Sequence, residues 1–354
     1  MQEQMTIKQR SALLSYPMAV FFFVVLVVGM SIFASETVSD EESLQYEREQ
    51  LNIDNPKVQK QLSEILSNQN DTLVHATYQP IKKEDFLELS LPNAHSAVIL
   101  DVDSGTILFE KEATEHRSIA SITKLVTAML VIDRVRDLNE VVVVPKEVIG
   151  IEGTKVGCPT SVICTSNRLQ VGEKVRVLDL LRAMLMFSAN DAATILGLHI
   201  GGTEEGFAKL MNARMKEIGA GNTHFCRPSG LELDENEQMC YSSAYDIARV
   251  GAHLLQYEKY DILWEIMRTK EATFTSVDGT IEHELKNTDR LLDKMPNLIG
   301  AKTGFTPRAG YSLLLAAHDG TKKHKIVSVV LDDYHRFNDV EEMTAWAFEN
   351  YKWQ

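Results

Sequence analysis

The distribution of apolar residues predicts a hairpin followed by a buried helix between residues 96 and 135. Two short apolar runs, Ser96–Leu100 and Thr106–Glu110, flank Asp103-Ser104-Gly105, a sequence typical of a tight turn. Residues 119–135 (IASITKLVTAMLVIDRV) are of helix length and apolar on nearly all faces. This pattern predicts a helix that is buried on every side.

The chain from about residue 140 to residue 290 is predicted to be mostly helical. Helix-type spacing covers residues 177–187, 190–200, 205–219 and 242–257. Apolar strands follow at Leu298–Thr303, Tyr311–Ala317 and Lys325–Leu331, and residues 339–351 form a closing amphipathic helix. Strands at both ends with helices between them indicate an α+β fold: one antiparallel sheet flanked by helices, with an inserted helical subdomain. We assign residues 85–354 to this domain.

The first 34 residues carry a pattern typical of a membrane anchor or a signal peptide. Residues 19–34 (AVFFFVVLVVGMSIFA) contain no charge. Lys8 and Arg10 precede this run and acidic residues follow it, which favours an amino end inside the cell and the remainder outside. The run is short for a spanning helix and slightly long for the core of a signal peptide. We favour an uncleaved anchor, with cleavage after Ala34 as the alternative.

Residues 35–84 are predicted to be an acidic linker. Between residues 35 and 80 there are nine acidic and three basic residues, and few aromatic ones. Such a composition does not bury enough apolar surface to fold alone. A short docked helix that starts at Pro56 and has Val58, Leu62, Ile65 and Leu66 on one face is an equally good interpretation.

Composition excludes some classes of function. The chain has 354 residues, 44% of them hydrophobic, enough for one large domain or two modest ones. Its 36 basic and 50 acidic residues give a net charge of −14, so no nucleic-acid partner is expected. The ten histidines and four cysteines show no metal-ligand spacing, and we expect His224 and His283 to be surface or hydrogen-bonded residues. Neither a metal nor a cofactor is expected.

Three short motifs indicate the chemistry: Ser121-Ile122-Thr123-Lys124, Ser188-Ala189-Asn190 and Lys302-Thr303-Gly304. In this order, SxxK, SxN and KTG form the active site of serine acyl-enzymes that bind penicillin. Lys124 lies one helical turn after Ser121 on the same face, within reach of the serine hydroxyl. Burial and the nearby Lys302 should lower the pKa of Lys124, because a protonated lysine cannot act as a base.

Each motif also has a purely structural interpretation. Ser121 and Lys124 could form an ordinary helix turn, although a charge inside an apolar helix is costly. Residues 188–191 could cap the following helix, and residues 302–304 could simply end a strand before Pro307. The ordered set of three favours the catalytic interpretation.

Longer segments around the motifs resemble the low-molecular-mass penicillin-binding proteins, specifically the D-alanyl-D-alanine carboxypeptidases of serine peptidase family S11. These segments are RSIASITKLVTAML, LLRAMLMFSANDAATILG, FAKLMNARMKEIGAGNTHF, PSGL, YSSAYDIARVG, KTGFTPRAGYSLLLAA and RFNDVEEMTAWAF, and they cover about residues 90–350. The resemblance implies a β-lactamase/transpeptidase-like fold. Many members add a carboxyl-terminal β domain with an amphipathic anchor. Since Gln354 follows the closing helix, we expect no such domain here and the amino-terminal segment as the anchor.

The resemblance implies catalytic roles for four residues. Ser121 would be the nucleophile and Lys124 its base, while Ser188 would relay a proton to the departing D-alanine. The backbone N–H groups of Ser121 and Phe305 would form the oxyanion hole.

It also implies how the substrate is held. The Asn190 amide would bind a peptide carbonyl of the substrate. Lys302 and the Thr303 hydroxyl would bind the terminal carboxylate, and Gly304 would leave room for the peptide along the strand. Arg336 aligns with a carboxylate-binding arginine found in part of the family.

We therefore expect a serine-type D-Ala-D-Ala carboxypeptidase that acts on peptidoglycan stem peptides and is covalently inhibited by β-lactam antibiotics. A DD-endopeptidase is the nearest alternative. A β-lactamase usually has SDN where this chain has SAN, and no deacylating glutamate loop is evident. A peptidoglycan-binding pseudoenzyme would be expected to have lost a motif residue, and none is lost. The catalytic domain should lie outside the cytoplasm at the cell membrane, or be secreted if the leader is cleaved.

An extracytoplasmic location would allow disulfides. Cys158 and Cys164 bracket a short loop that starts with Pro159. In the resembled family the segments that carry Cys226 and Cys240 flank one loop, which implies that their ends approach each other. We predict the pairs Cys158–Cys164 and Cys226–Cys240, with four reduced thiols as the alternative.

Overall fold

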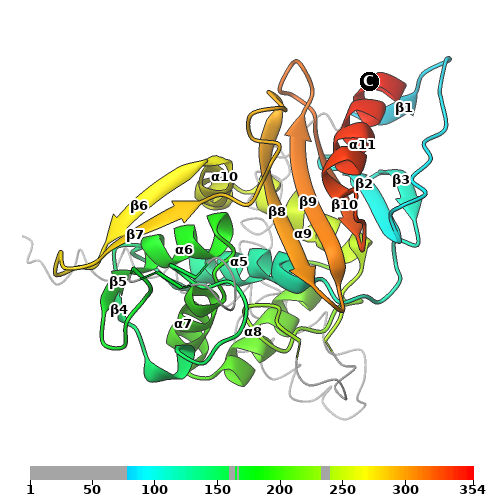
Figure 1. Cartoon of the computed structure of the whole chain (residues 1–354). Helices are drawn as coiled ribbons and strands as arrows, with labels where there is room; N and C mark the ends of the chain where they lie inside the picture. Colours follow the sequence, from blue (N-terminus) through cyan, green and yellow to red (C-terminus); the bar gives the residue numbers. More distant parts are fainter. Residues whose placement is uncertain (1–77, 159–163, 166, 233–239) are drawn as a thin grey trace, which may run out of the picture. The chain divides into compact units, whose positions relative to one another are not determined.

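The computed structural model describes residues 78–158, 164–165, 167–232 and 240–354 (Figure 1). The expected membrane segment at residues 19–34, the interpretation of Pro56 as a helix start and most of the expected linker lie outside the described residues. Within the described ranges, no helix combines the length and the apolar character needed to cross a membrane.

A five-stranded antiparallel sheet organises the described fold, with the strand order β3-β2-β10-β9-β8. Its strands are β2 (Ser96–Asp101), β3 (Ile107–Lys111), β8 (Leu298–Thr306), β9 (Gly310–His318) and β10 (Lys325–Leu331). Strands from the two ends of the domain meet at its centre, where Leu331 of β10 lies opposite Ser96 of β2. The predicted antiparallel sheet is therefore confirmed, and the predicted strands agree closely in position.

Successive residues of the strands face two separate cores. Ala97 and Ile99 of β2 pack in the core beneath α11 (Arg336–Asn350). Val98 and Leu100 face the opposite core, where they pack with residues of α9 (Ala244–Gln256). Because side chains alternate along a strand, a strand between two helical layers is apolar at every position.

The inserted helical region packs around α5 (Lys124–Arg134), which is buried along most of its length. Its neighbours are α6 (Val177–Met186), α7 (Asn190–Gly201) and α8 (Glu204–Glu217), and α10 (Asp261–Arg268) packs between α6 and β8. Figure 1 shows α6, α7 and α8 grouped beside the sheet. The predicted helical subdomain is confirmed.

Three two-stranded sheets are not predicted by the sequence pattern. β1 (Pro80–Lys82) pairs with β11 (Tyr351–Trp353), β4 (Val141–Val143) with β5 (Lys174–Arg176), and β6 (Glu271–Thr275) with β7 (Glu282–Lys286). β1 precedes residue 85, where the sequence analysis begins the domain. The 3-10 helices η1 (Ala120–Thr123), η2 (Lys146–Val148) and η3 (Glu258–Tyr260) complete the described elements.

Candidate active site

Ser121 lies in η1 and Lys124 is the first residue of α5. Side chains three residues apart are eclipsed in a 3-10 turn, which brings this serine and this lysine together. Lys124 Nζ lies 2.7 Å from Ser121 Oγ. Lys124 is fully buried, whereas Ser121 is partly exposed. The hydroxyl is thus open to a ligand while the amine beside it is shielded from water.

The Lys124 amine is held by three oxygens. Besides Ser121 Oγ, it donates to Asn190 Oδ1 at 2.7 Å and to the Ser229 carbonyl at 2.6 Å. Burial, and then the positive charge of Lys302, lowers the pKa of Lys124 well below its usual value, against an opposing effect of the Asp191 carboxylate. Both causes that the sequence analysis proposed for this shift are confirmed.

Ser188 lies in the turn between α6 and α7, and Asn190 is the first residue of α7. Ser188 has a φ of 63°, a left-handed conformation that is costly for a residue with a side chain and that is concentrated at functional sites. Lys302 Nζ donates to Ser188 Oγ at 2.9 Å. Asn190 is buried, and its Nδ2 donates to the Glu152 carbonyl at 2.8 Å. The N-cap residue of α7 is Ala189, which has no side-chain cap, but the Asp191 carboxylate accepts a hydrogen bond from the Ala192 N–H group in the first turn, so the capping interpretation holds only in part.

Lys302 and Thr303 lie on β8, the edge strand that packs against η1. Lys302 is buried, and its Nζ also donates to the Thr303 carbonyl at 2.9 Å. Thr303 Oγ1 lies 2.7 Å from Thr288 Oγ1. Burial, followed by the charge of Arg336, lowers the pKa of Lys302 to about 7.

Gly304 is required by the packing of β8 against η1. A Cβ atom at this position would lie 2.8 Å from the Ile119 carbonyl oxygen and 3.1 Å from Ile122 Cγ1. From the family resemblance, this glycine was expected to leave room for the substrate peptide along the strand. The structure adds a second cause, because the strand and the serine-bearing turn approach too closely for any side chain.

Phe305 and Arg336 lie at the same end of β8. The Phe305 side chain is 50% exposed and stacks on Tyr311, with ring centroids 4.3 Å apart. Arg336, at the start of α11, donates from Nη1 to the Gly304 carbonyl at 2.6 Å and to the Ser312 carbonyl at 3.1 Å. Burial lowers the pKa of Arg336 to about 10. The structure thus brings the predicted arginine to the KTG strand.

Sequence reasoning missed three contributors to this site. The Ser229 carbonyl binds Lys124 through the backbone, Thr288 contacts Thr303, and Asp191 lies within electrostatic range of Lys124. Asp191 is buried, which raises its pKa to about 6, and it accepts hydrogen bonds from the Val156 and Ala192 N–H groups. Its place directly after the SxN motif was the one available indication.

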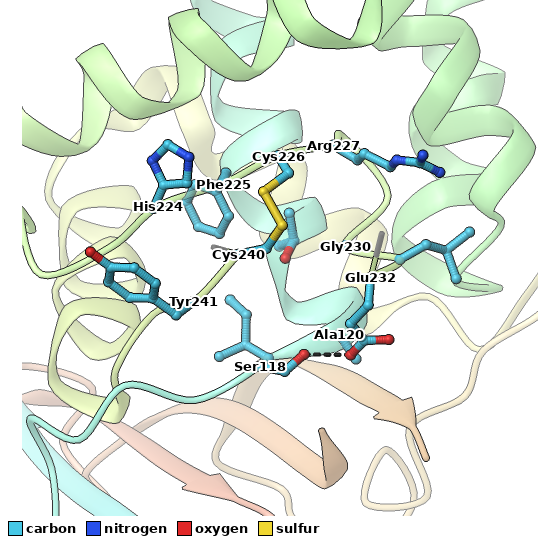
Figure 2. A pocket seen from close by; sticks show the side chains of 13 residues that line it. Ser118, Ala120, His224, Phe225, Cys226, Arg227, Gly230, Glu232, Cys240 and Tyr241 are labelled. Atoms are coloured by element: carbon cyan, nitrogen blue, oxygen red, sulfur yellow. Dashed lines mark hydrogen bonds between the residues drawn. A yellow bond between two sulfur atoms is a disulfide. The ribbon is translucent and has the colours of Figure 1, made fainter. Parts of the chain in front are cut away.

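Both predicted disulfides are present. Cys158 and Cys164 are bonded with their Cα atoms 4.1 Å apart, and Cys226 and Cys240 with theirs 5.6 Å apart. The structure therefore supports the uncrossed pairing over four reduced thiols. The second bond lies close to the serine-bearing turn, beside the small pocket drawn in Figure 2.

The profile of the Peptidase_S11 family, described as D-alanyl-D-alanine carboxypeptidase, matches residues 87–335. The D-alanyl-D-alanine carboxypeptidase DacF of Bacillus subtilis is 31% identical over 274 residues, which cover 73% of this chain and 63% of DacF. The chain therefore spans less than two thirds of the length of that relative.

Two further comparisons bear on the site. A D-alanyl-D-alanine endopeptidase of Escherichia coli is 29% identical over 255 residues, covering 71% of this chain and 76% of that protein. The crystal structure of penicillin-binding protein D2 from Listeria monocytogenes in its ampicillin-bound form aligns with a TM-score of 0.62 and 30% identity, covering 74% of this chain and 99% of that one. The three candidate motifs lie within the region matched by the family profile.

Proposed function

Since the chain belongs to the Peptidase_S11 family of D-alanyl-D-alanine carboxypeptidases, we propose that it removes the terminal D-alanine from peptidoglycan stem peptides through an acyl-enzyme on Ser121. The observation that carries the proposal is the Lys124 amine, fully buried and 2.7 Å from a partly exposed serine hydroxyl. No metal or cofactor takes part in the proposed reaction.

In the acylation step, Ser121 Oγ attacks the carbonyl carbon of the penultimate D-alanine while neutral Lys124 accepts the hydroxyl proton. Backbone N–H groups of Ser121 and Phe305 bind the oxyanion. The C–N bond then breaks, and the departing amine takes the proton that Lys124 received, relayed through Ser188, so that Lys124 is neutral again. Lys302 keeps its own proton, and its hydrogen bond of 2.9 Å to Ser188 Oγ supports the relay because it orients that hydroxyl.

Recognition of the substrate carboxylate is assigned to the KTG strand. Protonated Lys302 supplies the charge, and the Thr303 hydroxyl supplies a hydrogen bond. Arg336, bound to the Gly304 carbonyl, adds positive potential from behind the strand. Asn190 holds the peptide carbonyl of the incoming stem. In deacylation, water replaces the amine and Lys124 again accepts the proton.

β-Lactam antibiotics should acylate the same serine, since the Listeria relative has been crystallised in an ampicillin-bound form. An endopeptidase is the second candidate function, and one observation favours it. The match covers 76% of the Escherichia coli endopeptidase but only 63% of DacF. Both activities use the same acyl-enzyme and differ in whether the leaving amine is free D-alanine or a cross-linked peptide.

We further propose an extracytoplasmic location with residues 19–34 as the membrane anchor. The uncharged apolar run with preceding basic residues supports this orientation. Two disulfides in the catalytic domain also support it, because such bonds persist mainly in oxidising compartments.

The proposal is tested by labelling with a fluorescent penicillin, with mass mapping of the labelled peptide and an assay on a D-Ala-D-Ala pentapeptide. Wild type should carry the label on Ser121 and release D-alanine, and Ser121→Ala should do neither while keeping its far-UV circular dichroism spectrum. Amidating the terminal carboxylate should remove most of kcat/KM, about a hundredfold or more, since a charge-assisted contact is lost. A label on another residue would contradict the proposal, and cleavage of a cross-linked dimer alone would select the endopeptidase.

A further inference from the structure

One segment outside the three motifs, residues 226–232, contacts both the serine-bearing turn η1 and the start of α5. The Ser229 carbonyl accepts a hydrogen bond from Lys124 Nζ at 2.6 Å, and the Pro228 carbonyl accepts one from Thr127 Oγ1 at 2.7 Å. The 226–232 segment thus supplies one of the three oxygens that hold the Lys124 amine. A displacement of this segment would move the Ser229 oxygen away from the amine.

Gly230 shows how closely the 226–232 segment approaches η1. It has a φ of +76°, and a Cβ atom there would lie 2.6 Å from Thr123 Oγ1 and would also clash with the Ala120 carbonyl oxygen. No side chain separates the segment from the turn. A small shift of the segment would therefore change the Lys124 contact directly.

Glu232 fastens the carboxyl end of the 226–232 segment to both sides of the proposed oxyanion hole. A single oxygen, Oε1, accepts hydrogen bonds from the Ser118 hydroxyl and from Thr306 Oγ1, the latter at 2.6 Å. Ser118 lies two residues before η1, and Thr306 follows Phe305 on β8. Figure 2 shows the Glu232 side chain turned toward Ser118 beneath the disulfide. The carboxylate therefore joins the turn that carries one N–H group to the strand that carries the other.

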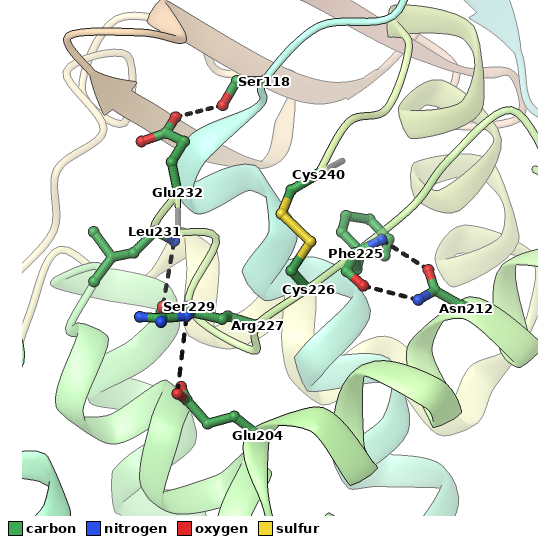
Figure 3. The surroundings of a disulfide bond; sticks show 10 residues. All are labelled: Ser118, Glu204, Asn212, Phe225, Cys226, Arg227, Ser229, Leu231, Glu232 and Cys240. Atoms are coloured by element: carbon green, nitrogen blue, oxygen red, sulfur yellow. Dashed lines mark hydrogen bonds and ion pairs between the residues drawn. A yellow bond between two sulfur atoms is a disulfide. The ribbon is translucent and has the colours of Figure 1, made fainter. Parts of the chain in front are cut away.

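The Cys226–Cys240 disulfide fastens the amino end of the segment (Figure 3). Cys240 precedes Tyr241, whose N–H and carbonyl pair with the backbone of His224 at 2.9 and 2.8 Å. Ser242 pairs in turn with Arg117, the residue before Ser118. The disulfide thus ties Cys226 to a backbone ladder that also supports the approach to η1.

We propose that the Cys226–Cys240 disulfide and Glu232 are positioning groups for acylation: they hold the 226–232 segment so that the Ser229 carbonyl stays on Lys124 and the two oxyanion-hole elements stay together. The inference rests on the proposed acyl-enzyme function. It makes acylation dependent on the redox state of this disulfide. A dithiol reductant would break the S–S bond, giving two protein thiols while it becomes a cyclic disulfide itself.

A positioning role predicts a change in the pH profile that a loss of stability would not produce. Lys124 faces Lys302 of β8 and Asp191 of α7, and its lowered pKa comes mainly from burial. Releasing the 226–232 segment lets water reach the amine, so the pKa of Lys124 rises toward its usual value. Acylation needs the neutral amine. The acidic limb of its pH–rate profile, where the rate rises as Lys124 loses its proton, must therefore move to higher pH.

The test measures the second-order rate constant for acylation by fluorescent penicillin between pH 5 and pH 10, at a temperature well below the Tm of every variant. The double variant Cys226→Ser/Cys240→Ser should acylate about tenfold more slowly than oxidised wild type, with its acidic limb at higher pH. Dithiothreitol should slow wild type to the same rate and leave the double variant unchanged. Thiol titration and peptide mapping confirm which bond is reduced.

Glu232 provides a matched pair of variants. Glu232→Ala removes the shared acceptor and should slow acylation about tenfold, whereas Glu232→Gln keeps an acceptor oxygen and should stay within about threefold of wild type. If the double variant and Glu232→Ala acylate like wild type with an unmoved acidic limb, the inference is wrong. The same holds if dithiothreitol slows the double variant as much as wild type, because the effect then belongs to Cys158–Cys164. Failure of oxidised wild type to acylate would instead overturn the proposed function.

Discussion

At the scale of single residues, the site depends on two buried lysines that both lie among the largest fully buried side chains. Each ammonium group is destabilised by burial, and Lys302 further disfavours the charge on Lys124. The proposed chemistry needs them in opposite states, because Lys124 must accept a proton while Lys302 must attract a carboxylate. A single proton placed on Lys302 meets both requirements and avoids two neighbouring buried charges.

This arrangement predicts a bell-shaped pH dependence for acylation of the free enzyme by penicillin. The rate should rise with pH as Lys124 loses its proton, because the neutral amine is the base. It should fall again as Lys302, with a pKa of about 7, loses the charge that attracts the ligand carboxylate. Acylation by a penicillin methyl ester should be slower and should lack the alkaline limb. An alkaline limb of equal size with the ester would show that Lys302 does not act through the carboxylate.

At the scale of secondary-structure elements, the contact between β8 and η1 determines the width of the site. Gly304→Ala places a methyl group against the Ile119 carbonyl and Ile122, so strand and turn must separate. We expect a loss of about 1–3 kcal/mol in the free energy of unfolding, together with slower acylation. Gly320→Ala is the matched control, because nothing lies within 4 Å of its added Cβ. Urea unfolding compares the two, and equal midpoints would refute the tight contact.

The elements that the sequence predicted well are those with long apolar runs. The short apolar run of β10 is typical of a buried strand, and the longer apolar run of α5 is typical of a buried helix. β7 could not be predicted in this way, because its sequence EHELK is polar except for one leucine. Its His283 is nevertheless buried and lies 2.7 Å from Glu173 Oε1, a partner far away in the sequence. Hydrogen bonding of His283 was expected, but its partner could not be.

The same distinction applies to the site. Side chains that act through their own chemistry, such as Ser121 and Lys302, could be predicted from motifs and then located. The role of the Ser229 carbonyl could not be predicted, because every residue carries a backbone acceptor. Only the folded path of the chain places this carbonyl next to the Lys124 amine. The disulfide pairing of Cys226 with Cys240 followed from the resemblance, whereas its position beside the serine-bearing turn could be found only from the fold.

At the scale of the whole domain, β1 joins the two ends of the described fold. Ile81 lies opposite Lys352, and Lys83 Nζ donates to the carbonyls of Phe348 and Glu349 at 3.2 and 2.6 Å. Trp353 Nε1 donates to Asp101 Oδ1 at 2.6 Å, which connects β11 to the central sheet. The closing helix is therefore fixed from the amino-terminal side, and it carries Arg336 at its start.

Truncation tests this connection together with the proposed anchor. A chain of residues 78–354 keeps β1 and should be acylated by penicillin like the full chain, but it should move from the membrane fraction to the soluble fraction. A chain of residues 86–354 lacks β1 and Lys83, and with them several hydrogen bonds to α11 and β11. Its free energy of unfolding should therefore be about 1–3 kcal/mol lower. Urea unfolding of the two truncated chains measures the difference, and fractionation of cells that express each chain tests the anchor. Equal unfolding free energies would show that β1 contributes nothing to the domain, and a membrane-bound 78–354 chain would exclude residues 19–34 as the sole anchor.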